Sequence, residues 1–203
     1  GKEVILIDTG DAIQGSLIGS YSKGRSIIEI MNELGYNAMT IGNHEFDYSV
    51  ENLKELKDYA QFPFLSCDFY ELSNNELIFE PYTIIEADGL KIAIIGITTP
   101  DTITSSTPTF FTDENNRFIY SFSSGPEELW MQVQKTVDEV NKKGADIVIA
   151  ASHLGSVEGY QYCCTDMIEN TLGIDVVLDG HSHSVIEGNT VKNKDGENVL
   201  LAS

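Results

Sequence analysis

The sequence of 203 residues is poor in basic residues and has no long hydrophobic run. Its 12 lysines and arginines stand against 32 aspartates and glutamates, which gives a formal net charge of −20. A charge of this sign repels nucleic acids and anionic membrane surfaces, so we expect neither as a partner. No stretch approaches the roughly 18 consecutive apolar residues of a membrane-spanning helix, so no membrane span is predicted. A phosphate substrate is not excluded, because bound dications invert the local sign of the charge.

Cysteine is also scarce, with three residues in the chain. Cys67 follows an apolar segment and is predicted to be a small buried hydrophobic residue. Cys163 and Cys164 are adjacent and have no Cys-x-x-Cys spacing. The sequence therefore predicts neither a disulfide framework nor a cysteine-based metal site.

The length and composition suit one large domain, which we expect to span residues 1–203. Hydrophobic residues make up 41% of the chain, enough for a sizeable core. There is no signal-like segment before the first apolar run at residues 4–7, and the last residues, 199–203, stop inside another apolar run. We expect the sequence to be a piece of a longer polypeptide.

Apolar runs alternate with segments of helical periodicity. Residues 4–7, 38–41 and 147–151 are continuous apolar runs, which are typical of strands buried on both faces. Residues 26–34 and 50–59 carry apolar side chains at helical spacing. This alternation predicts an α/β fold whose core sheet is largely parallel.

The middle of the chain has a different pattern. Asp88-Gly89 separates two apolar segments, which predicts a β-hairpin. Residues 101–123 have no clear period, and a loop of this length is either functional or mobile. Ser124, with Glu127 three residues later, predicts a capping box for a helix that reaches about Lys143.

Polar side chains with the chemistry of metal ligands follow several of the predicted strands. Carboxylate, amide and imidazole groups all bind divalent cations. The carboxyl ends of parallel strands meet at one edge of a sheet, where ligands collect, so we expect these side chains to converge. All four histidines of the chain are among them. The residues are Asp11, Asn43, His44, His153, His181 and His183.

Each of these residues also has a purely structural interpretation. Asp11 suits a turn or a helix N-cap, Asn43 suits a turn after Gly42, and a single histidine such as His153 is as consistent with a core position. His181 and His183 are either part of a polar turn or a ligand pair. In extended backbone, two residues at this spacing project to one face, and each imidazole could then serve one of two cations about 3.5–4 Å apart.

His44 and Asp47 form a second kind of pair. The side chain of His44 should point away from that of its neighbour Asn43, and a histidine beside a metal site can protonate a leaving group. Asp47 lies three residues further on and could hold the His44 ring in one tautomer. Alternatively, Asp47 caps the helix predicted to begin at residue 50, and one residue could do both.

Four motifs, in the same order along essentially the whole chain, carry a resemblance to a known family. They are Asp8-Thr9-Gly10-Asp11, Gly42-Asn43-His44-Glu45-Phe46-Asp47, Ser152-His153-Leu154-Gly155 and Gly180-His181-Ser182-His183. Together they resemble the calcineurin-like metallophosphoesterases. The nearer likeness is to the bacterial branch of 5′-nucleotidases, UDP-sugar hydrolases and 2′,3′-cyclic-nucleotide phosphodiesterases.

The resemblance implies a four-layer α/β-β/α sandwich of mixed sheets that holds two divalent metal ions, Zn, Mn or Fe. By the family's motifs, Asp11 would bridge the two ions. Asn43, His153 and His181 would complete one metal site, and His183 would serve the other. The resemblance also implies export to the periplasm or cell surface.

The implied reaction is the hydrolysis of a phosphate ester, in particular a nucleotide, by a metal-bound hydroxide. His44 and Asp47 would assist as the catalytic pair. Two alternatives stay open: a non-catalytic metal-binding fragment or surface module, and a related hydrolase that acts on a non-nucleotide ester such as a sulfur–oxygen substrate.

The sequence also departs from the family pattern. Members of the family open with an Asp-x-His motif on an earlier strand, and no such motif precedes Asp11. We therefore expect the first strand to be missing, and the chain to bind one ion well and the second poorly or not at all. We also expect a C-terminal domain of the parent chain, which would bind the nucleoside, to lie outside these residues.

Overall fold

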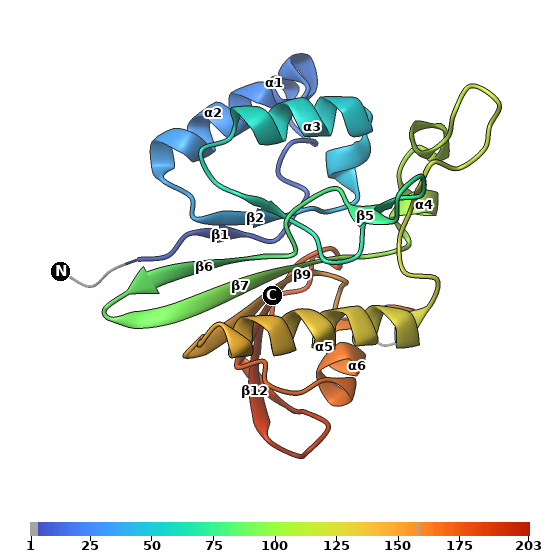
Figure 1. Cartoon of the computed structure of the whole chain (residues 1–203). Coiled ribbons are helices and arrows are strands. Elements are labelled where there is room, and N and C mark those ends of the chain that lie inside the picture. Colours follow the sequence, from blue (N-terminus) through green and yellow to red (C-terminus); the bar gives the residue numbers. More distant parts are fainter. Residues whose placement is uncertain (1–3, 158) are drawn as a thin grey trace.

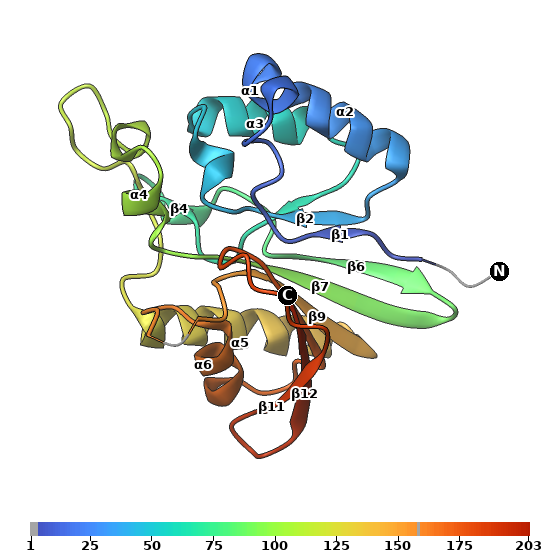
Figure 2. The same ribbon diagram turned by 180° about the vertical axis from the view of Figure 1, so that it is seen from behind.

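The computed structural model describes residues 4–157 and 159–203, which form four stacked layers (Figures 1 and 2). Helices cover the outer face of a three-stranded sheet, which packs on a six-stranded sheet. Further helices cover the far face of the larger sheet. This arrangement confirms the α/β-β/α sandwich that the resemblance implied.

The first two layers come from the N-terminal third of the chain. The three-stranded sheet is parallel, with β2 in the centre. Its strands are β1 (Ile7–Asp8), β2 (Ala38–Thr40) and β3 (Phe64–Leu65). The helices on its outer face are α1 (Leu17–Ser22), α2 (Arg25–Leu34) and α3 (Val50–Tyr59).

The larger sheet is mixed and has the strand order β11-β12-β10-β9-β7-β6. Its four inner strands are parallel, and the strand at each edge is antiparallel to its neighbour. The strands are β6 (Tyr82–Ala87), β7 (Leu90–Thr98), β9 (Ile147–His153), β10 (Val176–Asp179), β11 (Asn189–Lys192) and β12 (Asn198–Ala202). The helices that cover it are α5 (Pro126–Lys142) and α6 (Cys164–Asn170).

Short elements connect these layers. A small antiparallel sheet has the strand order β5-β4-β8. Its strands are β4 (Tyr70–Glu71), β5 (Glu76–Leu77) and β8 (Tyr120–Ser121). The remaining pieces are the helix α4 (Thr102–Ser105) and the 3₁₀ turns η1 (His44–Phe46) and η2 (Pro108–Phe111). The segment 101–123, predicted as a long loop, thus contains α4, η2 and β8.

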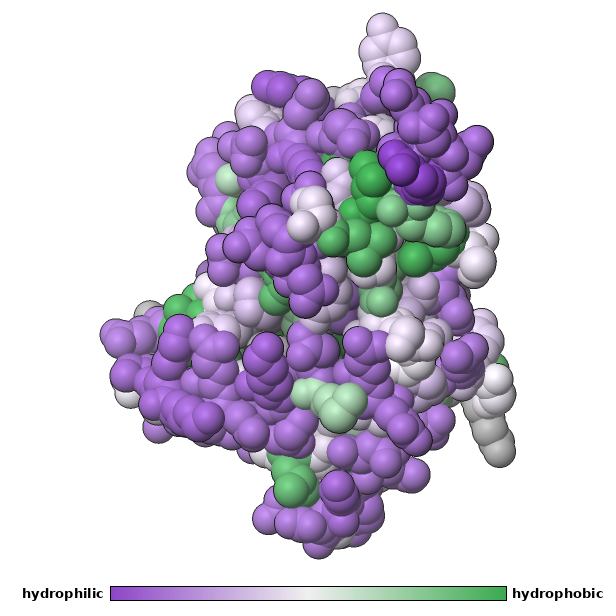
Figure 3. Space-filling view, turned by 45° about the vertical axis from the view of Figure 1, so that its right-hand side comes forward, coloured by the Kyte–Doolittle hydropathy of each residue, from purple (hydrophilic) through white to green (hydrophobic). Residues whose placement is uncertain are grey.

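Three hydrophobic cores fill the spaces between the four layers. The first packs Ile28 and Leu53 of the N-terminal helices against the small parallel sheet. The second lies between the sheets and includes Leu65 and Ile94. The third packs Val133 of α5 against the six-stranded sheet. The outer surface in Figure 3 is mainly hydrophilic, with one larger hydrophobic area in its upper half.

Several local predictions are confirmed. Helix α3 has the predicted bounds, and Gly35 ends α2 in left-handed backbone. Asp88 and Gly89 form the turn of the hairpin between β6 and β7, both with positive φ. None of the helices in the described part of the chain is long and apolar enough to cross a membrane.

The predicted capping box at the start of α5 names the wrong acidic residue as the partner of Ser124. Pro126 begins the helix and Gly125 is its N-cap, without a side-chain cap. Ser124 instead donates its backbone N–H to a carboxylate oxygen of Glu128, 2.7 Å away, and its hydroxyl contacts the same oxygen. Because the helix begins at Pro126, one residue later than the capping box requires, Glu128 rather than Glu127 reaches back to Ser124.

Candidate metal centre

The loops that follow β1, β2, β9 and β10 meet at one place, where the three-stranded parallel sheet adjoins the six-stranded sheet. A cavity of about 280 Å³ lies between the loops that follow β1, β9 and β10. Its lining is made of Gly10, Asp11, His153, Asp179, Gly180, His181, His183, Ser184 and Ser203. The predicted convergence of strand-end side chains is therefore present, and it joins segments more than 140 residues apart in the sequence.

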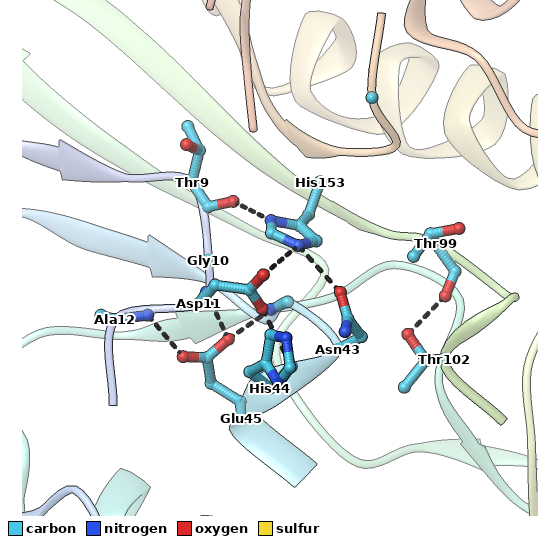
Figure 4. A network of polar contacts seen from close by, with 12 residues as sticks. Thr9, Gly10, Asp11, Ala12, Asn43, His44, Glu45, Thr99, Thr102 and His153 are labelled. Carbon is cyan, nitrogen blue, oxygen red and sulfur yellow. Dashed lines mark hydrogen bonds and ion pairs between the residues drawn. The ribbon is translucent and has the colours of Figure 1, made fainter. Parts of the chain in front are cut away.

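His153, the last residue of β9, is the centre of this cluster (Figure 4). Its Nδ1 atom lies 2.6 Å from the carbonyl oxygen of Thr9. Since a carbonyl only accepts, Nδ1 must carry the proton. The Nε2 atom then faces two oxygens, the side-chain oxygen of Asn43 at 3.2 Å and Oδ2 of Asp11 at 3.1 Å. A metal-binding histidine is oriented in this way, with one ring nitrogen donating to the protein and the other directed at the ion.

His181 completes the group. One ligand atom each from Asp11, His153 and His181 can be chosen so that all three lie within 4.8 Å of one another. The rings of His153 and His181 have centroids 5.0 Å apart. One carboxylate, two imidazoles and a nearby amide oxygen form a donor set that suits Zn, Mn or Fe, so these residues fit a divalent transition metal ion.

The electrostatics of the group reflect this crowding. Burial tends to raise the pKa of Asp11, but the hydrogen bond and charge of His153 outweigh burial and lower it. Burial would lower the pKa of His153, yet its contacts with Asp11 raise it. For His181, burial and the charge of His153 lower the pKa. The Asp11 carboxylate is thus held in the ionised form that a cation requires.

Of the two alternatives for His181 and His183, the backbone has the turn and is not extended. Both residues have left-handed backbone, with φ of 72° and 53°. The N–H of Ser182 donates to the carbonyl of Gly180, which closes a tight bend after β10. His183 lines the cavity but, among the described residues, it does not belong to the compact group of ligand atoms.

Two glycines allow the loops after β1 and β2 to touch. A Cβ atom on Gly10 would lie 2.6 Å from Nδ1 of His153 and 2.7 Å from the backbone nitrogen of Gly42. A Cβ atom on Gly42 would lie 2.4 Å from Oδ1 of Asp11. These distances are too short for any other residue at either position. Asp11 itself has φ of 66°, a left-handed conformation that non-glycine residues seldom adopt.

Glu45 is a buried carboxylate for which sequence analysis assigned no role. Its side chain accepts hydrogen bonds from the backbone N–H groups of Asp11, Ala12, Ile13 and Gly42. Burial and the charge of Asp11 raise the pKa of Glu45 to about 7. No local pattern could have revealed this role, because three of the four donors lie more than 30 residues away along the chain.

His44 and Asp47 form the predicted pair. Nδ1 of His44 lies 2.6 Å from Oδ2 of Asp47, and the other carboxylate oxygen accepts from the hydroxyl of Ser106 at 3.4 Å. Burial would lower the pKa of His44, but its hydrogen bond to Asp47 and the nearby acidic groups raise it above its ordinary value. Ser49, rather than Asp47, caps α3. The backbone N–H of His44 donates to Oδ1 of Asp11, 2.9 Å away. This bond links the His44–Asp47 pair to the group of Asp11, His153 and His181.

Asp179, at the end of β10, is a second buried carboxylate to which sequence analysis gave no role. Its Oδ1 atom accepts from the hydroxyl of Ser152 at 2.7 Å and from the N–H groups of Leu154 and Gly155 at 3.2 and 3.3 Å. These bonds hold the turn that follows His153. Asp179 is not among the residues of the compact ligand group in the described part of the chain.

Comparisons with known proteins agree with this geometry. A model of the calcineurin-like phosphoesterase family matches residues 1–185. The 5′-nucleotidase of Vibrio cholerae is 30% identical over 194 residues, which are 92% of this chain and 33% of that protein. The snake venom 5′-nucleotidase of Gloydius brevicauda is 34% identical over 190 residues, which are 91% of this chain and 29% of that protein.

A solved structure is also similar. The 5′-nucleotidase precursor from Thermus thermophilus superposes with a TM-score of 0.79 at 28% identity, over 98% of this chain and 39% of that one. The chain spans about a third of the length of the two curated relatives described above. Because the family model covers nearly all of these residues, the chain belongs to the calcineurin-like phosphoesterase family.

Proposed function

We propose that this chain is the catalytic part of a metal-dependent hydrolase of phosphate esters, and that its substrates are nucleotides. The observation that supports this most strongly is the convergence of Asp11, His153 and His181 within 4.8 Å, next to the paired side chains of His44 and Asp47. Binding groups for a cation and a proton donor are the two components that metal-assisted ester hydrolysis needs.

In this proposal Asp11, Asn43, His153 and His181 hold one divalent ion. Asp11 and His183 contribute to a second. Such ions, when bound, act as Lewis acids on the phosphate and lower the pKa of a coordinated water towards about 7. Nitrogen and oxygen donors of this kind suit Zn, Mn or Fe.

The chain's own residues prepare the site. The Nδ1–H of His153 is engaged by the Thr9 carbonyl, which directs Nε2 towards the cluster. The backbone N–H of His44 holds one oxygen of the Asp11 carboxylate, and the second oxygen faces His153. Both side chains are thus oriented before any ion or substrate binds, which reduces the reorganisation required on binding.

His44 supplies the proton for the leaving group. Its Nδ1 atom is bonded to Asp47, so Nε2 is the nitrogen left to face a substrate. The raised pKa of His44 favours the protonated form of the ring. As the ester bond to phosphorus breaks, the Nε2–H passes its proton to the leaving alcohol oxygen, and Asp47 stabilises the ring throughout.

The choice of nucleotides rests on relatives rather than on a pocket of this chain. The similar proteins from Vibrio cholerae and Gloydius brevicauda are named 5′-nucleotidases, and both are about three times as long as the matched segment. We therefore propose that a C-terminal domain of the parent chain binds the nucleoside. One of these relatives is a snake venom protein, which supports our expectation of a location outside the cytoplasm.

Hydrolysis assays test the proposal. The native polypeptide that contains these 203 residues should release phosphate from an aryl phosphate and from nucleoside monophosphates when Mn²⁺ is added. Asp11→Asn should reduce the rate at least about 100-fold. Asp138→Asn is the matched control, because it removes an exposed carboxylate from α5 and should leave the rate unchanged.

The same assay separates the alternatives. Mn²⁺ binding without hydrolysis of any ester would contradict the proposed enzymatic function and favour a non-catalytic metal-binding module. Hydrolysis of sulfur–oxygen esters without activity on nucleotides would contradict the proposal that the substrates are nucleotides. It would favour a related hydrolase that acts on a non-nucleotide ester.

A further inference from the structure

Glu45 combines complete burial with an unusual set of partners. Its side chain is fully buried, and no ion pair with Glu45 occurs among the described residues. Burial of an unpaired carboxylate is strongly unfavourable unless hydrogen bonds compensate for the lost hydration. Here four backbone N–H groups do so, which makes Glu45 a fixed anchor for the backbone around it.

The four donors belong to two different loops. Oε2 accepts from the N–H groups of Asp11 and Gly42, each at 2.7 Å. Oε1 accepts from Ala12 at 2.8 Å and from Ile13 at 3.3 Å. One carboxylate therefore joins the loop after β1 to the turn after β2 (Figure 4).

This connection between the two loops fixes the position of Asp11 relative to Asn43 and His44. Asp11 has left-handed backbone, which is unfavourable for most residues, so the loop needs an external constraint to keep it. Glu45 supplies that constraint at the N–H of Asp11 itself. The turn that carries Glu45 also carries Asn43 and His44, so one anchor sets the relative position of all three groups.

Glu45 cannot itself be a ligand in this arrangement. An ionised carboxylate has about four lone-pair sites. All four are directed at backbone N–H groups, and none is left for a cation or a substrate.

We propose that Glu45 is a positioning residue of the metal centre, which holds the Asp11 loop and the Asn43 turn in the register that creates a tight cation site. The inference rests on the metal site of the proposed function, but not on the identity of the substrate. Its effect is carried through hydrogen bonds to the backbone, without contact with the ion.

Mn²⁺ affinity of the chain, measured by calorimetry, tests the role directly. Glu45→Gln keeps the size but turns one acceptor oxygen into a donor that faces two N–H groups, so the dissociation constant should rise about 10- to 100-fold. Glu45→Asp keeps the charge but is one methylene shorter and cannot reach both loops. It should weaken Mn²⁺ binding as well, which separates positioning from simple charge attraction.

Asp68→Asn is the matched control. Asp68 also has a fully buried carboxyl group, and its Oδ1 atom accepts a hydrogen bond from the hydroxyl of Ser66. Its replacement makes the same carboxyl-to-amide change at another fully buried position and should change the Mn²⁺ dissociation constant by less than about twofold, the scatter expected for a residue outside the coupled group. Amide NMR signals of Asp11, Ala12, Ile13 and Gly42 should shift in both Glu45 variants and stay in place in the control.

Three outcomes would overturn the inference. The first is a folded Glu45 variant that binds Mn²⁺ as tightly as the unchanged chain. The second is an unchanged chain that binds no Mn²⁺. The third is unfolding of both Glu45 variants, which would show that Glu45 supports the whole fold. If Mn²⁺ affinity depends on Glu45 while no phosphate ester is hydrolysed, the proposed function fails and the inference stands.

Discussion

His153 and Thr9 are 144 positions apart in the sequence, and the Nδ1 atom of His153 lies 2.6 Å from the carbonyl oxygen of Thr9. This bond ties the end of β9 to the loop after β1 and therefore joins the six-stranded sheet to the three-stranded parallel sheet at the candidate site. It also selects the ring tautomer, so that Nε2 is the nitrogen directed at Asp11 and Asn43.

Replacing His44 with asparagine should lower turnover without removing the metal. The amide cannot pass a proton to the leaving oxygen, so kcat should fall by about 10²- to 10⁴-fold. Metal content by elemental analysis should stay nearly the same, because His44 is bonded to Asp47 and does not belong to the compact group of ligand atoms in the described part of the chain. Loss of metal in this variant would contradict the proposed role of His44 as a proton donor and indicate that it binds the ion.

The chain should hold one ion tightly, and not two. Ligand atoms of Asp11, His153 and His181 lie within 4.8 Å of one another, and the amide oxygen of Asn43 lies 3.2 Å from Nε2 of His153. His183 lies outside this compact group in the described part of the molecule. Elemental analysis after dialysis should give one ion per chain. His181→Ala should abolish tight binding, and His183→Ala, its matched control, should retain it. Two tightly held ions per chain would contradict the prediction.

Alanine at Gly42 should disrupt the contact between the two ligand loops. Its Cβ atom would lie 2.4 Å from Oδ1 of Asp11 and 2.9 Å from Oε2 of Glu45. Overpacking of this kind destabilises by about 1–3 kcal/mol, and urea unfolding measures it.

Gly125→Ala is the control for this steric effect. No atom lies within 4 Å of a Cβ placed on Gly125, and its φ of 179° is open to any residue. Loss of an N-cap glycine should lower the free energy of unfolding by less than about 1 kcal/mol. Equal losses in the two variants would argue against close packing at Gly42.

Asp68 should make the stability of the protein depend on pH. Burial raises the pKa of Asp68 from its ordinary 3.8 to about 8. Between these values the folded state keeps a proton that the unfolded state releases. The stabilisation is therefore fully present below about pH 4 and is lost as the pH rises through about 8. The neighbouring Cys67, Tyr70 and Tyr162 have raised pKa values and stay neutral over this range.

Urea unfolding of the unchanged chain and of Asp68→Asn at pH 5 and pH 8 measures this effect. The free energy of unfolding should fall more steeply with pH in the unchanged chain, by up to several kcal/mol, because the amide does not titrate. Parallel slopes for the two proteins would show that Asp68 does not titrate in this range.

The architecture could be predicted where a local pattern has one structural outcome. The helical period of residues 50–59 and the Asp88-Gly89 turn each specify an element directly, and both are confirmed. Asp11 and His153 both follow strands, as the sequence analysis expected of ligand-type residues, but the two strands belong to different sheets, which the rule for a single sheet does not predict. Strands of two residues, such as β4 and β5, leave too short a pattern to detect.

The finer geometry of the site depends on contacts between distant segments. The role of Glu45 is set by N–H groups 32 to 34 positions away, and no pattern around Glu45 reveals them. The left-handed backbone of His181 and His183 follows from a bend that their spacing alone does not indicate. Sequence therefore predicted that Asp11, His153 and His181 meet, and the structure was needed to show how they are held.

Anomalous diffraction from crystals of the chain grown with Zn²⁺ tests the central claim most directly. We predict one strong peak about 2.0–2.2 Å from a carboxylate oxygen of Asp11, the amide oxygen of Asn43, Nε2 of His153 and a ring nitrogen of His181. A peak at a different place, or one coordinated by the histidines while the Asp11 carboxylate lies far from it, would contradict the metal centre and the hydrolase built on it.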